Sequence, residues 1–346
     1  GQHLLEVDDL KMYFHTEDGV VRAVDGVSYT LDRGETLGVV GESGSGKSVT
    51  AMTIMGLISM PPGKIEGGDV RYRGRSILEM TEEEMQHIRG NDIAMIFQDP
   101  MTSLNPVYKI GKQVGEGLRL HRGYSKQEAL KRATELLDLV GIPEPEKRVN
   151  EYPHQFSGGM RQRVMIAMAL ACDPDILIAD EPTTALDVTI QAQIIELMQE
   201  MQEKNGNAII MITHDLGVVA DMADKIMVMY AGRPVEFGTA EEIFYESRHP
   251  YTWGLIRSIP EQAIEEKKPL TPIHGNPPSL MNLPEGCVFS PRCPYATDKC
   301  RKQRPERVVT ESGHYSACHY SGDPEFLKNA PETSRTRKDS KKGGEA

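Results

Sequence analysis

Long hydrophobic runs are absent from this sequence of 346 residues, and acidic residues outnumber basic ones. No apolar run approaches the ~20 residues that a helix needs to cross a bilayer, so we expect no membrane-spanning segment. The first residues have neither the basic start nor the unbroken apolar stretch of a secretory signal. The net charge of −12, from 39 Lys and Arg against 51 Asp and Glu, argues against a broad nucleic-acid-binding face.

Short apolar runs are present, and they predict an α/β core. The chain is longer than one ordinary hydrophobic core needs and suits two domains. Three of the four runs are nearly continuous, which is typical of strands buried on both faces of a parallel sheet. A segment with helical periodicity, 192–204, separates two of them. The four runs are 36–40, 93–97, 176–179 and 208–212.

Two other regions depart from this strand pattern. Between Gly111 and Pro153 the sequence predicts a helical insertion, with Ser125 as an N-cap and Gly141 as a helix stop. After about residue 260 the periodicity gives way to Pro-rich segments that contain cysteines. The last residues are polar and poor in apolar side chains, so we expect a disordered tail.

The stretch Gly41–Ser48 reads GESGSGKS and fits the phosphate-loop pattern G-x-x-x-x-G-K-[ST]. A predicted strand precedes it and a helical segment follows, as phosphate binding requires, because backbone N–H groups and the helix N-terminus face the anion. We expect the Lys47 ammonium to reach the β- and γ-phosphates and the Ser48 hydroxyl to ligate Mg²⁺. The sequence therefore predicts binding of a nucleoside triphosphate, by Ser43, Gly44, Ser45, Gly46, Lys47, Ser48 and Val49.

Polar side chains follow three of the other predicted strands. Asp180 and Glu181 come directly after one of them, where ligands of open α/β sheets bind. We expect Asp180 to associate with Mg²⁺ and Glu181 to polarise the attacking water. His214 ends the next strand and can contact the γ-phosphate or orient that water. Gln98 ends a third strand, and its amide can contact both Mg²⁺ and water.

Five motifs in order, GESGSGKS, IFQDP, SGGMRQR, ILIADEPTTALD and ITHD, resemble the ATP-binding subunit of ABC transporters over about residues 4–258. Narrower features, QDPMTSLNP, HPYTWGL and LPEGCVFSPRC, resemble the ATPases of oligopeptide and dipeptide importers, a group that includes nickel importers. The resemblance implies a phosphate-loop NTPase (ABC ATPase) domain at 1–258, with an antiparallel β subdomain and a helical subdomain at about 105–165. A Cys-rich C-terminal extension follows at 259–325, and the disordered tail covers 326–346.

The resemblance also implies an ATP site shared by two ATPase subunits. In this family two such chains face head to tail, so Ser157, Gly158 and Gly159 serve the partner's nucleotide, and Asp187 lies in a loop that crosses the dimer. Tyr13 matches the aromatic residue that stacks on adenine, and Arg22 lies near the same pocket. Met160 departs from the pattern, because the commonest residue there is Gln and a thioether cannot form the hydrogen bonds of an amide.

The function that the resemblance implies is ATP hydrolysis coupled to solute import. ATP closes the dimer, hydrolysis reopens it, and the motion passes to two membrane permease subunits docked around Gln98–Val107. An extracytoplasmic binding protein takes part indirectly, no nucleic acid is involved, and the subunit works at the cytoplasmic face of the cell membrane. The cargo stays open between dipeptides, oligopeptides and nickel, as does whether the second ATPase is an identical chain or a homologous one.

Two rival functions belong to other classes. A soluble ABC ATPase acting on DNA or on ribosomes is disfavoured by the acidic composition, by the single cassette and by the lack of heptads between the phosphate loop and SGG. A redox- or iron-sensing regulator, with ATP hydrolysis as a secondary property, is the other. It would lose transport-linked ATPase on oxidation without losing its fold.

Cysteine is scarce, yet four of the five cysteines gather near the C-terminus. Structural disulfides are rare in cytosolic proteins, so metal binding is favoured. No C-x₂₋₄-C pair typical of zinc occurs, and the wide irregular spacing suits a [4Fe–4S] cluster better. Zinc and unligated thiols stay open, and the predicted small metal-binding lobe uses Cys287, Cys293, Cys300 and Cys318. Cys172 is expected to be a small buried core residue.

Overall fold

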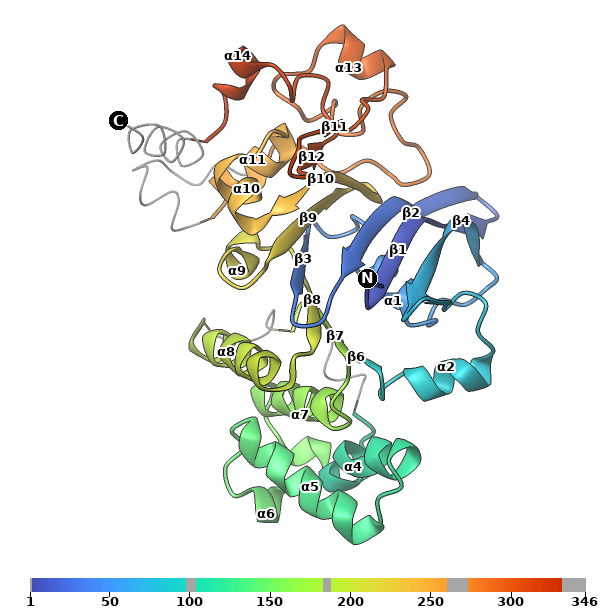
Figure 1. Ribbon diagram of the computed structural model, residues 1–346, viewed down its shortest axis with the longest axis vertical. Helices are drawn as coiled ribbons and strands as arrows, with labels where there is room; N and C mark the ends of the chain where they lie inside the picture. Colours follow the sequence, from blue (N-terminus) through green and yellow to red (C-terminus); the bar gives the residue numbers. More distant parts are fainter. Residues whose placement is uncertain (1, 98–103, 183–187, 260–272, 332–346) are drawn as a thin grey trace. The chain divides into compact units, whose positions relative to one another are not determined.

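The computed structural model describes residues 2–97, 104–182, 188–259 and 273–331 (Figure 1). Side chains at positions 188 and 190 are outside this description. The chain divides into two compact units. The first unit contains Gly1–Thr30, Thr36–Arg75 and Thr213–Ala346, and the second contains Leu31–Glu35 and Ser76–Ile212.

The N-terminal part of the first unit is an antiparallel sheet. Its strand order is β2-β1-β4-β5, and β1 pairs with β4 in a register that runs from Leu5↔Tyr72 to Phe14↔Gly63. Leu5, Val7, Leu10 and Met12 are buried on β1, which gives this sheet an apolar face. The strands are β1 (Leu5–Thr16), β2 (Gly19–Leu31), β4 (Gly63–Tyr72) and β5 (Arg75–Ser76).

A second group of strands in the same unit carries the phosphate-loop sequence. β3 (Thr36–Val40) is buried throughout and pairs in parallel with β9 (Lys225–Tyr230). β10 (Arg233–Thr239) pairs antiparallel with β9, and β12 (Tyr315–Ser316) pairs antiparallel with β10. β11 (Val308–Val309) pairs with β12, so the C-terminal segment extends the sheet of the core. The helices of this unit are α1 (Lys47–Ile54), α9 (Leu216–Ala220), α10 (Ala240–Tyr245), α11 (Pro250–Arg257), α13 (Asp298–Lys302) and α14 (Pro324–Leu327).

The second unit combines a parallel sheet with a group of helices. β7 (Ile176–Asp180) lies between β6 (Ile93–Ile96) and β8 (Ala208–Thr213), and both pairings are parallel. Every residue of the three strands is buried, as the continuous apolar runs predict. Figure 1 shows α4, α5 and α6 gathered beside α7. The helices are α2 (Glu82–Ile88), α4 (Ile110–His121), α5 (Lys126–Leu139), α6 (Pro145–Arg148), α7 (Gly158–Leu170) and α8 (Val188–Asn205), with a 3₁₀ turn, η1, at Pro153–Gln155.

Local sequence signals account for many of these elements. Ser125 caps α5 by accepting a hydrogen bond from the Glu128 N–H while Glu128 bonds back to the Ser125 N–H, which is a capping box. Gly141 follows the helix with φ of +82° and confirms the predicted stop. The four predicted strands are confirmed as β3, β6, β7 and β8. Over the described ranges, no helix is both long and apolar enough to cross a membrane.

The C-terminal boundary of the ordered chain differs from the expectation that a disordered tail begins at 326. α14 extends through Leu327, and the Asn329 carbonyl accepts a hydrogen bond of 2.8 Å from Arg257. Residues 332–346 lie outside the described residues, so the disorder predicted for them stays a prediction.

Candidate functional site

The phosphate-loop sequence lies between β3 and α1, as its pattern predicts. Gly46 is the N-cap of α1 and has φ of +94°. A Cβ at Gly46 would lie 2.3 Å from the carbonyl oxygen of Ala23 and 3.2 Å from Cα of Gly232. Only glycine combines this backbone conformation with such a close approach. The loop is therefore wedged against β2 and the β9–β10 turn.

The loop is also tied to its surroundings by backbone hydrogen bonds. The Gly232 N–H donates to the Ser45 carbonyl at 2.9 Å, and the Asp25 N–H donates to the Gly232 carbonyl at 2.8 Å. The Ser45 hydroxyl is buried and has no hydrogen-bond partner among the described residues. Lys47 is only 5% exposed. Because the first N–H groups of a helix lack intrahelical partners, this cradle has the donors that a phosphate group requires.

A network around Tyr13 occupies the antiparallel sheet. The Tyr13 hydroxyl donates to Oδ1 of Asp25 at 2.6 Å, and Arg233 forms an ion pair with the other oxygen of that carboxylate. Burial, followed by the hydrogen bond to Asp25, raises the pKa of Tyr13 to about 12. The guanidinium carbon of Arg22 lies 5.8 Å from the centroid of the Tyr13 ring. The structure thus brings Arg22 beside Tyr13, the residue expected to stack on adenine.

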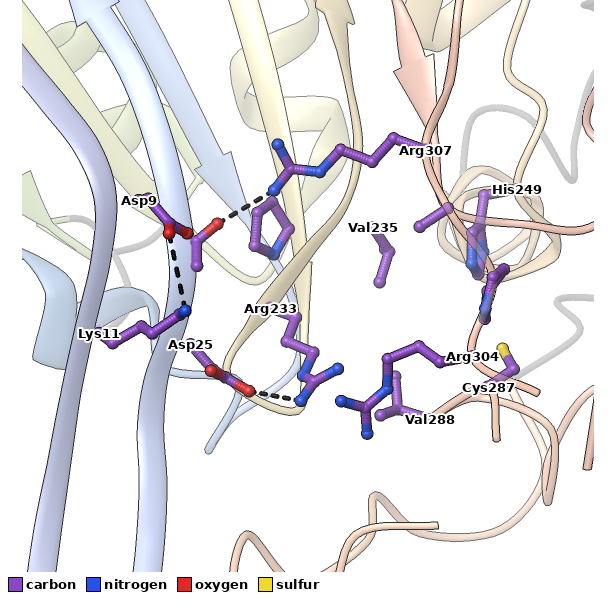
Figure 2. A pocket seen from close by; sticks show the side chains of 14 residues that line it. Asp9, Lys11, Asp25, Arg233, Val235, His249, Cys287, Val288, Arg304 and Arg307 are labelled. Atoms are coloured by element: carbon purple, nitrogen blue, oxygen red, sulfur yellow. Dashed lines mark hydrogen bonds and ion pairs between the residues drawn. The ribbon is translucent and has the colours of Figure 1, made fainter. Parts of the chain in front are cut away.

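A cavity of about 370 Å³ adjoins this network (Figure 2). Figure 2 shows Asp25 and Arg233 paired at its edge, with Arg304 extending toward them from the C-terminal segment. Burial and the neighbouring Arg233 lower the pKa of Arg304. Lys11 and Arg307 also line the cavity. Cations outnumber the two carboxylates, Asp9 and Asp25, so this side of the Tyr13 network is electropositive.

The acidic pair belongs to the second unit. Asp180 ends β7, and Asp180 and Glu181 are 6% and 7% exposed. Glu181 has φ of +46°, and its N–H donates to the Ile212 carbonyl of β8 at 2.8 Å. A non-glycine residue at positive φ is uncommon and is concentrated at functional sites. The Gln162 amide of α7 donates to the Pro182 carbonyl, which fixes the chain just beyond Glu181.

The SGG segment begins α7. Ser157 is its N-cap and accepts a hydrogen bond of 3.3 Å from the Met160 N–H. Ser157 and Gly158 are exposed, and a Cβ at Gly158 would meet open space. The N–H groups at this helix start are therefore available to a ligand outside the chain. The Met160 N–H is already used by the cap, and its thioether adds no amide donor.

The remaining predicted nucleotide residues are placed in part. His214 follows β8 directly and is exposed. Gln98 and Asp187 lie outside the described residues. Tyr13, the phosphate loop and His214 belong to the first unit, whereas Asp180, Glu181 and the SGG segment belong to the second. Sequence reasoning missed Asp25 and Arg233, because no local pattern marks an ion pair between residues 208 positions apart.

The four C-terminal cysteines line one small cavity of about 20 Å³. Burial raises the pKa of Cys287, raises that of Cys293 to about 11 and raises that of Cys318 to about 12. Opposing this effect, hydrogen-bond donors approach the sulfurs. Thr297 Oγ1 lies 3.3 Å from the Cys300 sulfur. The backbone at Phe289, Ser290, Tyr295 and Tyr320 and the Ser321 side chain partly offset this rise in the pKa of the other three thiols.

The geometry of the described residues does not support the expected metal-binding lobe. In the part of the chain that the structure describes, no group of three or more His, Cys, Asp or Glu side chains is arranged to hold a metal ion. All five cysteines are free thiols, which excludes a disulfide pairing in this structure. Cys172 lies just after α7 and is buried, as expected for a structural core residue. Its carbonyl accepts a hydrogen bond of 2.7 Å from Arg122.

Two protein-family models match the chain. Residues 24–184 match the family described as ABC transporter. Residues 235–300 match the oligopeptide/dipeptide transporter, C-terminal region. The second match covers three of the four clustered cysteines.

Several curated proteins are similar over most of the chain. The oligopeptide transport ATP-binding protein OppD of Bacillus subtilis is 58% identical over 312 residues, which cover 90% of this chain and 87% of the relative. The dipeptide transport ATP-binding protein DppD of Escherichia coli is 52% identical over 320 residues, covering 92% of this chain and 97% of the relative.

Solved structures with the same fold include an ATP-binding cassette and a part of an ABC transporter complex. A dimeric post-hydrolysis state of MJ0796, bound to ADP and Pi, has a TM-score of 0.62 and 29% identity, covering 68% of this chain and 98% of that one. The structure of cbiO1 from Clostridium perfringens, part of the ABC transporter complex cbiONQ, has a TM-score of 0.60 and 29% identity. The match covers 71% of this chain and 92% of the cbiO1 chain.

Proposed function

Because the chain belongs to the ATP-binding subunits of ABC transporters, in the oligopeptide/dipeptide group, we propose that its ATP hydrolysis powers peptide import. ATP hydrolysis itself follows from the family. The observation that carries the proposal is the glycine cradle at Gly46, in a chain 58% identical to a peptide-transport relative. The matched C-terminal region and the relatives' names favour this function over an ATPase that acts on DNA or ribosomes.

The nucleotide is proposed to bind through its phosphates to the loop before α1. Lys47 neutralises the β- and γ-phosphates, Ser48 and Asp180 ligate Mg²⁺ with Gln98, and Tyr13 stacks on adenine beside Arg22. Glu181 acts as the general base for the attacking water, and His214 contacts the γ-phosphate or orients that water. The left-handed conformation of Glu181 supports this role, because strained residues occur where a side chain must be aimed.

Each ATP is proposed to be held by two ATPase chains. Ser157, Gly158 and Gly159 donate backbone N–H groups to the partner's γ-phosphate, and Asp187 follows the acidic pair in a loop at the dimer contact. Two observations support the first part: the exposed, capped start of α7, and the dimeric state of the similar cassette bound to ADP and Pi. ATP therefore bridges the chains, and hydrolysis removes the bridge.

Two permease subunits are proposed as the membrane partners of this chain. The chain would bind them peripherally, at the cytoplasmic face of the membrane. Their docking segment is 98–107, of which only 104–107 are described. Val107 is 70% exposed and Tyr108 is 43% exposed. Such large apolar side chains at the surface support a protein contact there.

Reconstitution tests the cargo. The chain is combined with the permease subunits, the solute-binding protein and its partner ATPase in vesicles, and ATP-driven uptake of a dipeptide, a longer peptide and Ni²⁺ is measured. Uptake of either peptide above a Lys47→Ala control supports the proposal. Uptake of Ni²⁺ without either peptide would assign the chain to the nickel branch of the group and contradict peptide import.

A [4Fe–4S] cluster held by Cys287, Cys293, Cys300 and Cys318 is proposed for the C-terminal lobe, with Zn²⁺ as the alternative. Its support is the convergence of four thiols on one cavity, with Thr297 Oγ1 3.3 Å from the Cys300 sulfur. The cavity is small, and no metal-holding group is formed by the described residues. When bound, such a group supplies a covalent cross-link to a lobe with few aliphatic residues.

A further inference from the structure

We propose that Arg292, in the C-terminal lobe, is a positioning residue for the phosphate loop and sets the affinity for ATP through Glu42. Glu42 is the second residue of GESGSGKS, whereas Arg292 directly precedes Cys293. The proposal deepens the proposed function and rests on the assignment of this loop to ATP.

The two side chains form a bidentate ion pair. Nη1 of Arg292 lies 2.9 Å from Oε2 of Glu42, and Nη2 lies 3.1 Å from Oε1. The Arg292 side chain is 5% exposed and that of Glu42 is 26% exposed. Two parallel hydrogen bonds between a guanidinium and a carboxylate fix direction as well as distance. The pair spans 250 positions of sequence and joins the lobe directly to the loop.

Arg292 is itself held in place by further acceptors. Its Nε donates to the His274 carbonyl at 2.8 Å, and Nη2 donates to the Gly275 carbonyl at 3.2 Å and the Ile273 carbonyl at 3.4 Å. Its guanidinium carbon lies 5.8 Å from the Tyr230 ring centroid. The guanidinium therefore cannot leave Glu42 without losing several other contacts.

Glu42 is held through its backbone as well. Its N–H donates to the Tyr251 hydroxyl at 3.0 Å, and its carbonyl accepts from the Ser45 N–H at 3.2 Å. The Tyr251 ring packs on those of Tyr230 and Phe289, with centroids 4.7 and 5.3 Å away. Arg292 of the C-terminal lobe and Tyr251 of α11 together fix the position of Glu42. Glu42 in turn begins the turn that leads to Gly46.

The charge of Arg292 has a second consequence. An unpaired carboxylate within the phosphate loop would repel a triphosphate, because two negative groups at close range in partly buried surroundings are screened only weakly. Arg292 neutralises that carboxylate. Removing Arg292 alone therefore weakens ATP binding through both lost positioning and repulsion, whereas removing the Glu42 charge as well abolishes the repulsion.

Steady-state ATP hydrolysis by the complete transporter tests the proposal with Arg292→Ala, Glu42→Gln and the double variant. We expect Arg292→Ala to raise the KM for ATP by about tenfold with kcat changed less than about threefold, because the lost contact acts equally on ground and transition states. The double variant is expected to recover the part of this loss that comes from repulsion and to keep the part that comes from lost positioning. Arg301→Ala, in the same lobe, removes only an exposed pair with Asp298 and leaves KM unchanged.

Two outcomes would overturn the proposal. One is an unchanged KM in Arg292→Ala. The other is a double variant in which the KM increases of the two single variants multiply, since Arg292 and Glu42 would then act independently of each other. If Arg292→Ala unfolds below the assay temperature, Arg292→Lys replaces it in the test. This variant keeps the charge but loses the bidentate geometry, so it is predicted to raise KM by a smaller factor. An unchanged KM in Arg292→Lys would equally contradict the proposal. Lys47→Ala distinguishes failure of this proposal from failure of the proposed function. Retained ATP binding in Lys47→Ala would refute the assignment of the loop to ATP.

Discussion

The Tyr13 hydroxyl donates a hydrogen bond of 2.6 Å to the Asp25 carboxylate, which also pairs with Arg233 of β10. This network ties the first strand of the antiparallel sheet to the turn that supports the phosphate loop. The tyrosine that is proposed to stack on adenine is therefore fixed by its hydroxyl, while its ring face interacts with Arg22.

Replacing the Tyr13 ring tests adenine stacking. Tyr13→Ala is expected to raise the KM for ATP about tenfold, because base–aromatic stacking contributes about 1–3 kcal/mol. Tyr13→Phe keeps the ring and loses only the bond to Asp25, so its KM should stay within about threefold. The measurement is ATP hydrolysis against ATP concentration. Equal defects in both variants would show that the hydroxyl, and not the ring, determines affinity.

Glu181→Gln is expected to reduce ATP turnover by a factor of about 10² or more, the usual contribution of a general base. The same variant should accumulate a closed, ATP-bound dimer, detected by light scattering after gel filtration with ATP. Glu196→Gln on α8 changes an exposed carboxylate and is the matched control. Undiminished turnover in Glu181→Gln would contradict the role given to Glu181.

Gly46→Ala is expected to abolish detectable ATP binding, since the added Cβ would lie 2.3 Å from the Ala23 carbonyl oxygen. Gly90→Ala is the matched control, because Gly90 has a similar φ of +80° but no atom within 4 Å of the added Cβ. The control should lose about 1–2 kcal/mol of stability from backbone strain and keep ATP binding. Equilibrium binding of a fluorescent ATP analogue distinguishes the two, and normal affinity in Gly46→Ala would exclude the wedged loop.

Stability should depend on the protonation of His249. Burial lowers the pKa of His249 from its ordinary 6.5 to about 4, and its Nδ1 accepts the Tyr251 N–H at the start of α11. The unfolded chain binds this proton below pH 6.5 and the folded chain does not. Neutral His249 therefore makes its full contribution to the free energy of unfolding above pH 6.5. About 3 kcal/mol of this free energy is lost as the pH falls toward 4.

His249→Asn isolates this effect, because Asn also caps helices and does not titrate. Denaturant titration at several pH values measures the unfolding free energy of both proteins. Below pH 6.5 the wild type should lose stability relative to His249→Asn. A constant difference between pH 7 and pH 4.5 would mean that His249 takes up its proton as readily in the folded chain as in the unfolded one.

Metal content separates the cluster from its alternatives. Anaerobically prepared protein is expected to contain about four iron and four sulfide per chain with a visible absorbance band, and Cys293→Ser should lower both. Cys172→Ser, outside the cavity, is the control. One zinc per chain would show a zinc site in place of the cluster. Protein free of both metals would show that the four thiols bind no metal.

Short-range patterns in the sequence predicted the elements around the site well. Continuous apolar runs located β3, β6, β7 and β8, because a strand buried on both faces needs no polar alternation. The spacing of Ser125 and Glu128 located the start of α5, because a capping box is a local interaction. The antiparallel sheet of β1, β2 and β4 was expected from family resemblance alone.

Long-range pairs were beyond sequence reasoning. Arg292 and Glu42 are 250 positions apart, and Asp25 and Arg233 are 208 apart. An arginine in either place reads locally as an ordinary exposed residue, and only the folded chain shows that burial requires its partner. The left-handed backbone of Glu181 was equally hidden, because glutamate carries no signal for positive φ.

In the proposed mechanism, each ATP is held by two ATPase chains. The direct measurement is ATP turnover per chain over a dilution series, with the oligomeric state followed by light scattering in the same samples. Turnover per chain is predicted to fall with the fraction of dimer and to approach zero for monomers. Monomers that hydrolyse ATP at the undiluted rate per chain would contradict the shared site.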